Sequence, residues 1–246
     1  MTLLVPVGAA MLGFEPRDRP DRCCIEMAAR GPEADLPLFR ETRINDPERA
    51  IHALAAQAAC CTRCDLYKHA TQTVFGEGPA DAALMLIGEQ PGDQEDLTGR
   101  PFVGPAGKVL DRALEAAGIE RTQIYITNAV KHFKNEPRGK RRLHKKPDTG
   151  EIEACRWWLD NELEIIQPAV AVALGATAAR ALMQKALAIN ANRGLLVALP
   201  GGGKGLITVH PSYLLRLQDE RDKRREFDLL VKDLHAAAAA ARKARA

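Results

Sequence analysis

The sequence has no long hydrophobic run, no basic start and little net charge, and each absence argues against a class of protein. None of its apolar stretches is long enough to cross a bilayer, so we expect no membrane association. Its first residues are mildly apolar, but no basic residue precedes them, which makes a poor signal peptide. We therefore expect a cytoplasmic protein, and nothing in the sequence demands more than a monomer.

Cysteines are also few for a disulfide-stabilised secreted domain. The 246-residue chain has six, in three places: Cys23-Cys24, Cys60-Cys61 with Cys64, and Cys155. A Cys-x-x-Cys pair in a cytosolic protein points to metal or redox chemistry. Three thiolates together with the imidazole of His132 can hold zinc or an iron–sulfur cluster, and spacing alone does not choose between them. Free core thiols are the simpler alternative, and Cys60 could compete with Cys61 as a ligand.

The net charge of +3 says little about partners, but its distribution says more. The sixteen residues from Lys131 to Lys146 have eight basic residues and one acidic residue, Glu136, a net charge of +7. Such a concentration is typical of a surface that binds a polyanion. A solvated basic loop with no partner is the alternative.

Strand-like apolar runs alternate with helical periodicity along most of the chain. The runs cover residues 83–88, 124–128, 169–174 and 205–209. This alternation predicts an α/β fold, a three-layer αβα sandwich around a central, mainly parallel four-stranded sheet. We assign residues 46–246 to this domain and residues 1–45 to an N-terminal extension of unknown role.

Polar segments follow three of the predicted strands, at residues 88–107, 128–146 and 210–216. The carboxyl ends of parallel strands meet at one edge of a sheet, which places Glu89, Gln90, Asn128 and His210 close together. The first segment also offers several carboxylates and the flat ring of Phe102. The sequence therefore predicts a small polar pocket in which a flat ligand could stack on an aromatic ring.

Two residues of this edge suit recognition of a nucleobase, although each has a plain structural alternative. The amide of Asn128 could read the imide edge of a pyrimidine, or could bond to local backbone. His210 could donate to an anionic leaving group, or could be a satisfied core histidine. The glycine-rich run at 201–205 lacks the spacing of a Walker A loop, which argues against nucleoside triphosphate binding.

Four motifs then establish a family resemblance: GEQPGDQEDLTGRPFVGPAG, TNAVKH, ACRWWL and HPSYLLR. Their order resembles that of the iron–sulfur uracil-DNA glycosylases, from about Cys61 to the end of the chain. The basic GKRRLH segment is similar to the KRRIH-type loop of the UdgX branch, with Leu143 in place of isoleucine. His132 also resembles UdgX, because ordinary members of the family have cysteine at this position.

The resemblance implies a [4Fe–4S] cluster held by Cys61, Cys64, His132 and Cys155. It implies a uracil pocket made by Gln90, Asp93, Phe102, Asn128 and His210. We assign DNA binding to Lys140, Arg141, Arg142, Lys145 and Ser212.

The expected activity is excision of uracil from single-stranded or duplex DNA. Phe102 would stack on the flipped base, Asn128 would pair with it, and His210 would stabilise the charge that develops on uracil O2. His144 would then bond to C1′ of the deoxyribose, with Glu89 as its proton acceptor. The alternatives are an ordinary hydrolytic uracil-DNA glycosylase with turnover and a non-enzymatic iron–sulfur protein that binds DNA or senses redox state.

Overall fold

A five-stranded sheet with the order β2-β1-β5-β7-β6 organises the computed structural model, which describes residues 46–139, 141–199 and 201–245. The strands are β1 (Leu84–Gly88), β2 (Tyr125–Asn128), β5 (Val170–Leu174), β6 (Leu196–Ala198) and β7 (Lys204–Thr208). The first three and β7 are parallel, whereas β6 pairs antiparallel with β7. The predicted N-terminal extension, residues 1–45, lies outside the described part of the chain.

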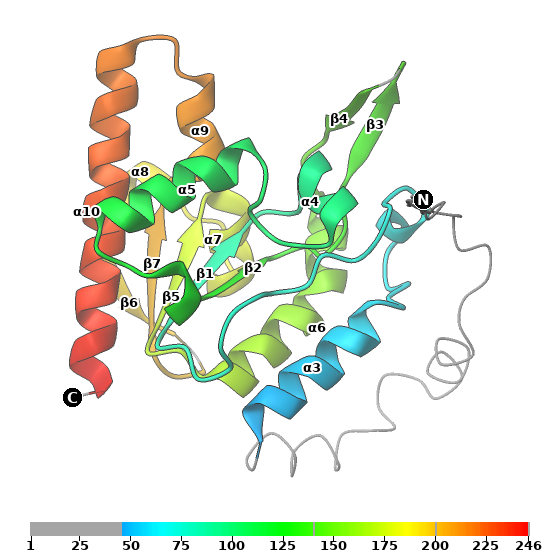
Figure 1. Cartoon of the computed structure of the whole chain (residues 1–246), viewed down its shortest axis with the longest axis horizontal. Helices are drawn as coiled ribbons and strands as arrows, with labels where there is room; N and C mark the ends of the chain where they lie inside the picture. Colours follow the sequence, from blue (N-terminus) through cyan, green and yellow to red (C-terminus); the bar gives the residue numbers. More distant parts are fainter. Residues whose placement is uncertain (1–45, 140, 200, 246) are drawn as a thin grey trace, which may run out of the picture. The chain divides into compact units, whose positions relative to one another are not determined.

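Helices cover both faces of the sheet, which confirms the predicted three-layer fold (Figure 1). The helices α3 (Pro47–Ala58), α6 (Thr149–Ile166) and α7 (Ala176–Met183) share one face, and α5 (Pro105–Ala116) and α10 (Glu220–Arg245) share the other. Side chains of β1 alternate between the two layers: Met85 and Ile87 join the first core, and Leu84 and Leu86 join the second. Both faces of β1 are buried, so its sequence is a continuous apolar run.

The sheet has one strand more than predicted, because the apolar residues near 196 form the edge strand β6. This strand hydrogen-bonds on one side only, and all of its residues are exposed. Residues 195–199, LLVAL, are apolar throughout and flank a glycine turn with residues 205–209, a pattern that predicts a hairpin, and the antiparallel pairing of β6 with β7 confirms it.

The basic segment after β2 is a hairpin rather than a loop. Its strands are β3 (Asn135–Arg138) and β4 (Arg141–His144), and Asn135 pairs with His144. Gly139 takes a left-handed conformation at the turn, with φ of 60°. Charged residues dominate both strands, so the apolar alternation that normally predicts strands is absent. Lys140 is outside the described residues.

Short helices complete the connections. They are η1 (Asp65–Lys68), α4 (Asp93–Thr98), η2 (Arg121–Gln123), α8 (Ile189–Asn192) and α9 (Pro211–Arg216). The segment 88–107 thus contains a helix, α4. Among the described helices, none combines the length and apolarity that crossing a membrane would need.

Candidate functional site

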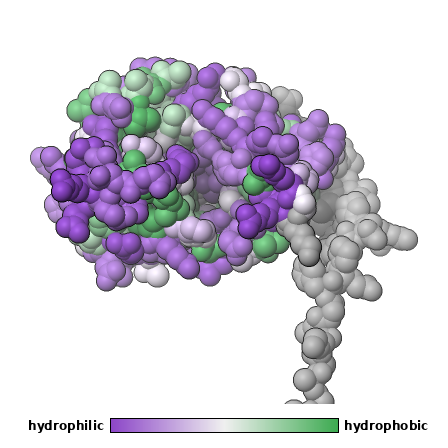
Figure 2. Space-filling model, turned by 90° about the horizontal axis from the view of Figure 1, so that it is seen from above, coloured by the Kyte–Doolittle hydropathy of each residue, from purple (hydrophilic) through white to green (hydrophobic). Residues whose placement is uncertain are grey.

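A cavity of about 730 Å³ opens at the carboxyl ends of β1, β5 and β7. Its walls include Glu89, Gln90, His144, His210, Arg216 and Arg225. Figure 2 looks onto this end of the molecule and shows hydrophilic side chains on both sides of a central hollow. The strand edge thus brings together the residues after β1 and after β7, and the hairpin adds His144 to them.

Asn128 and Phe102 meet above Gly88, the last residue of β1. A Cβ at Gly88 would lie 2.3 Å from Asn128 Oδ1 and 2.5 Å from Phe102 Cζ, so only glycine lets both side chains approach this strand end. Phe102 has a φ of 55°, a conformation that costs a non-glycine residue about 1–3 kcal/mol and is typical of functional sites. Its ring centroid lies 5.8 Å from that of His210.

The amide oxygen of Asn128 is buried and has no hydrogen-bond partner among the described residues. Buried polar atoms in native proteins nearly always have a partner. An unpartnered acceptor next to an aromatic ring therefore indicates that a ligand supplies the missing N–H.

His210 has a defined tautomer. Its Nδ1 accepts the backbone N–H of Ser212 at 3.2 Å and lies 2.8 Å from the Ser212 hydroxyl, so the ring proton is on Nε2. Burial lowers the pKa of His210 to about 4, with smaller contributions from His144 and Arg216. The ring is neutral at pH 7 and offers one N–H to a ligand. Ser212, predicted to bind DNA, thus positions His210.

Glu89 is held by a residue that the sequence did not indicate. Thr177, nearly buried in the first turn of α7, donates its hydroxyl to Glu89 Oε2 at 2.5 Å. The other carboxylate oxygen lies 3.7 Å from His144 Nε2. Thr177 follows β5 by the short turn at Gly175, so the strand-edge argument could have found it.

Gln90 holds the base of the hairpin. Its Oε1 accepts the Lys134 N–H at 3.1 Å, and its Nε2 donates to the Lys145 carbonyl at 3.0 Å. The same Nε2 lies 2.9 Å from His144 Nε2, which must accept and therefore leaves the ring proton on Nδ1. Gln90 thus contacts both ends of the hairpin and orients His144, and its predicted role in uracil binding stays a prediction.

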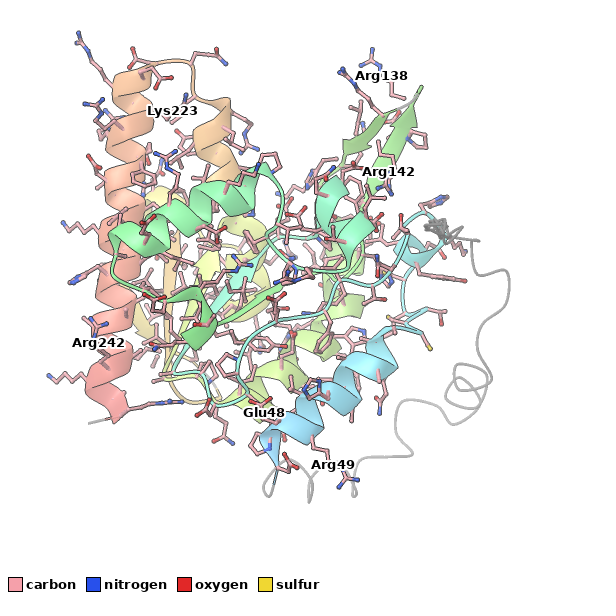
Figure 3. All side chains as sticks on the ribbon, viewed as in Figure 1. Glu48, Arg49, Arg138, Arg142, Lys223 and Arg242 are labelled. Atoms are coloured by element: carbon pink, nitrogen blue, oxygen red, sulfur yellow. The ribbon has the colours of Figure 1, made fainter. Side chains whose placement is uncertain are left out.

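Arg142 and Asp93 interact with each other rather than with a ligand. Arg142 Nε lies 2.7 Å from Asp93 Oδ1, and its Nη1 lies 2.5 Å from Asp96 Oδ2 (Figure 3 labels Arg142). Asp96 is fully buried, so the guanidinium is committed to it. Arg142 and Asp93 together hold the hairpin against α4, and their roles in DNA binding and uracil binding stay predictions.

Other basic residues of the segment 131–146 differ in their burial and in their partners. Lys131 is fully buried and pairs with the buried Glu162 at 2.5 Å, so it cannot face a polyanion. Its ammonium also donates to the carbonyl of Asn128 at 2.8 Å, which fixes this strand end. Lys145 pairs with Glu136 at 2.5 Å but is half exposed, and Arg141 is exposed.

Three free cysteines lie near one another beside α6. Cys61 and Cys155 are buried, Cys64 is partly buried, and both Cys61 and Cys64 interact electrostatically with Cys155. Burial raises the pKa of the Cys155 thiol to about 12. Both buried sulfurs accept hydrogen bonds, Cys61 from the Trp158 indole and Cys155 from the Lys131 backbone, each at 3.1 Å. Thiolates in this setting need a bound cation.

His132 presents a bare nitrogen in the same region. Thr73 donates its only hydroxyl proton to the Ala58 carbonyl at 2.8 Å, so at 2.9 Å it must accept from His132 Nε2–H. His132 Nδ1 is then a buried lone pair without a partner in the described residues. Burial lowers the pKa of His132 to about 4, which keeps the ring neutral. A neutral imidazole with a free lone pair is what a metal ligand requires.

Within the described ranges, no three histidine, cysteine, aspartate or glutamate side chains are grouped so that they could hold one metal ion. In a multi-iron cluster each ligand binds a separate iron, so the ligands lie further apart than around zinc.

Comparison with known proteins agrees with the fold. The family described as the Uracil DNA glycosylase superfamily matches residues 75–235. A type-4 uracil-DNA glycosylase of Thermotoga maritima is 41% identical over 170 residues, which are 69% of this chain and 85% of that protein. The type-4 enzymes of Archaeoglobus fulgidus and Sulfurisphaera tokodaii are 42% and 38% identical over 53% and 55% of this chain, and over 62% and 59% of their own lengths.

The fold and the site define a base-recognising α/β protein with its pocket at the carboxyl edge of a parallel sheet. The chain belongs to the uracil-DNA glycosylase superfamily.

Proposed function

We propose that this protein excises uracil from DNA and then bonds covalently to the abasic sugar through His144. The observation that carries the proposal is the unpartnered Oδ1 of Asn128, which is buried beside Phe102, whose ring centroid lies 5.8 Å from that of the cavity residue His210. Stacked uracil in a DNA strand could not reach a buried amide, so the nucleotide must be flipped out.

Asn128 would distinguish uracil from cytosine. Its Oδ1 would accept N3–H of uracil, while Phe102 stacks on the ring. Cytosine has a bare nitrogen at this position, so two acceptors would face each other without a proton. An unsatisfied pair of this kind costs about 1–3 kcal/mol in a buried site.

His210 supports the bond cleavage. As the bond between C1′ and uracil N1 breaks, the electron pair leaves with uracil, and negative charge develops on its O2. The Nε2–H of His210 would donate to that oxygen. Because the pKa of His210 is about 4, the ring acts as a neutral donor throughout the physiological range.

His144, rather than water, would be the nucleophile that attacks the sugar. The departing base leaves an oxocarbenium-like C1′, which a neutral imidazole nitrogen can attack with its lone pair. The attack uses the lone pair of Nε2 and gives an imidazolium, whose charge the Glu89 carboxylate, 3.7 Å from His144 Nε2 in the free protein, stabilises, while the proton on Nδ1 can leave to water. Gln90 and Arg142 hold the hairpin that delivers His144. This is the chemistry expected of a UdgX-like member of the superfamily.

Cys61, Cys64, His132 through Nδ1, and Cys155 would hold a [4Fe–4S] cluster. When bound, the cluster would join the segment after α3 to α6 and to the segment after β2, and so stabilise the base of the site.

A denaturing gel tests the proposal with a 5′-labelled strand that contains one uracil. A retarded protein–DNA band is expected from the wild type, and an alkali-labile strand without that band is expected from His144→Ser. An alkali-labile product from the wild type would indicate ordinary hydrolysis. An intact strand would refute the glycosylase assignment.

A further inference from the structure

The buried ammonium of Lys131 lies directly behind the residue that carries base recognition. Lys131 is fully buried, and its ammonium has three protons to donate. Each proton has an acceptor: the Glu162 carboxylate at 2.5 Å, the Thr127 hydroxyl at 2.6 Å and the backbone carbonyl of Asn128 at 2.8 Å. One of the three bonds therefore ends on the main chain of the residue whose amide oxygen has no partner.

The backbone of Lys131 is fixed as well. Its N–H donates to Cys155 Sγ at 3.1 Å, and its carbonyl accepts the Val74 N–H at 2.8 Å. Cys155 and Glu162 both belong to α6 and lie about two turns apart, so one helix contacts both ends of Lys131. The ammonium therefore has little freedom to move away from the Asn128 carbonyl.

Stability is a weak explanation for this buried ion pair. The removal of two charges from water offsets much of their attraction, and apolar residues of similar size often stabilise a protein as well or better. Glu162 also accepts the hydroxyls of Tyr125 and Thr127, each at 3.0 Å, so its carboxylate has other donors. The bond to the Asn128 carbonyl is the contact in this group that depends on the ammonium alone.

The amide of Asn128 has little space in which to be misplaced. A Cβ on Gly88 would lie 2.3 Å from Asn128 Oδ1, so this oxygen is packed closely against the end of β1. The pairing of Asn128 with Gly88 fixes its backbone on one side, and the bond from Lys131 fixes its carbonyl. Together these contacts set the direction in which the Asn128 side chain leaves the backbone.

We propose that Lys131 is a positioning residue that aims the Asn128 amide at the base and so determines the preference for uracil over cytosine. The inference rests on the proposed function, because it requires a base beside Asn128. Lys131 touches no base itself and acts through the Asn128 backbone. Without the ammonium the carbonyl loses its donor, the end of β2 shifts, and Oδ1 no longer lies in line with N3–H of uracil.

The test uses Lys131→Met/Glu162→Gln, which removes both charges of the pair and leaves the net charge unchanged. Methionine keeps the length of the lysine carbon chain, and glutamine keeps an acceptor oxygen for the hydroxyls of Tyr125 and Thr127. Tyr125→Phe is the matched control, because the hydroxyl that it removes donates to the same Glu162 and not to Asn128. Both variants should keep the wild-type melting temperature and the wild-type affinity for uracil-free DNA.

Fluorescence anisotropy compares two strands that contain 2′-fluoro-2′-deoxyuridine or 2′-fluoro-2′-deoxycytidine at the same position. The fluorine opposes positive charge at C1′, so the glycosidic bond stays intact. The wild type should prefer the uracil strand. Lys131→Met/Glu162→Gln should lower this preference by roughly 5- to 150-fold, the range expected for one buried hydrogen bond, and Tyr125→Phe should retain it.

An unchanged preference in the double variant, or an equal loss in Tyr125→Phe, would overturn the proposal. If the double variant does not fold, Lys131→Leu/Glu162→Leu replaces it, and failure of both to fold would also overturn the proposal, because the pair would then be needed for the fold itself. A wild type without preference for the uracil strand would reject the proposed function. A preference that survives in the double variant would reject only the role of Lys131.

Discussion

Thr177→Val removes the hydroxyl that holds Glu89, while the side chain keeps its shape. Thr177 is nearly buried and donates to Glu89 Oε2 at 2.5 Å, and the opposite oxygen of that carboxylate faces His144. Without the hydroxyl the carboxylate can rotate away from the imidazole. Capture of the sugar by His144 then loses the anion that stabilises the imidazolium.

The expected slowing of covalent capture follows from the type of hydrogen bond that is lost. A hydrogen bond to a charged group contributes about 1.5–3 kcal/mol. At about 1.36 kcal/mol for each factor of ten, covalent capture should slow roughly 10- to 150-fold. Uracil release depends on Phe102, Asn128 and His210, so it should change much less. Free abasic DNA should therefore accumulate.

The assay is a single-turnover time course in which uracil release and the retarded band are measured from the same samples. Thr177→Ser, which keeps the hydroxyl, is the matched control and should restore capture to within a few fold of the wild type. Equal melting temperatures would exclude a folding defect. If the valine variant captures DNA at the wild-type rate, Thr177 does not position Glu89 for this step.

Three further variants or conditions test other parts of the site. Gly88→Ala should abolish uracil release but keep uracil-free DNA binding in an anisotropy assay, because its Cβ would collide with Asn128 and the Phe102 ring. Since the pKa of His210 is about 4 in the fold and 6.5 when unfolded, its ring takes up a proton only in the unfolded state between these values. The free energy of unfolding should therefore fall as pH drops from 6.5 to 4, and His210→Asn should reduce this slope by up to about 1.4 kcal/mol per unit in urea titrations. Cys155→Ala should lower the iron content measured by elemental analysis, and an unchanged content would remove Cys155 from the ligands.

The layers of the fold and the edge that holds the site could be predicted because they depend on long apolar runs. β1 and β5 are buried on both faces, and polar residues begin where these strands end. The strand-edge rule then placed Glu89, Gln90 and His210 at one cavity without any knowledge of contacts.

The roles of charged residues could not be predicted in the same way, because they depend on partners distant in sequence. Lys131 and Arg142 look alike within a basic run, yet one is buried against Glu162 and the other is paired with Asp96. The hairpin could not be predicted for a related reason, since polar or charged residues occupy both sides of its strands and leave no apolar alternation.

The mass of the protein after incubation with a short uracil-containing strand tests the central claim most directly. Bond exchange at C1′ should give a species equal to protein plus oligonucleotide minus one uracil, and peptide mapping should place the linkage on His144. His144→Ser should remain unmodified while free uracil appears. Unmodified wild-type protein beside an abasic strand would contradict capture by His144, and unmodified protein beside an intact strand would contradict uracil excision itself.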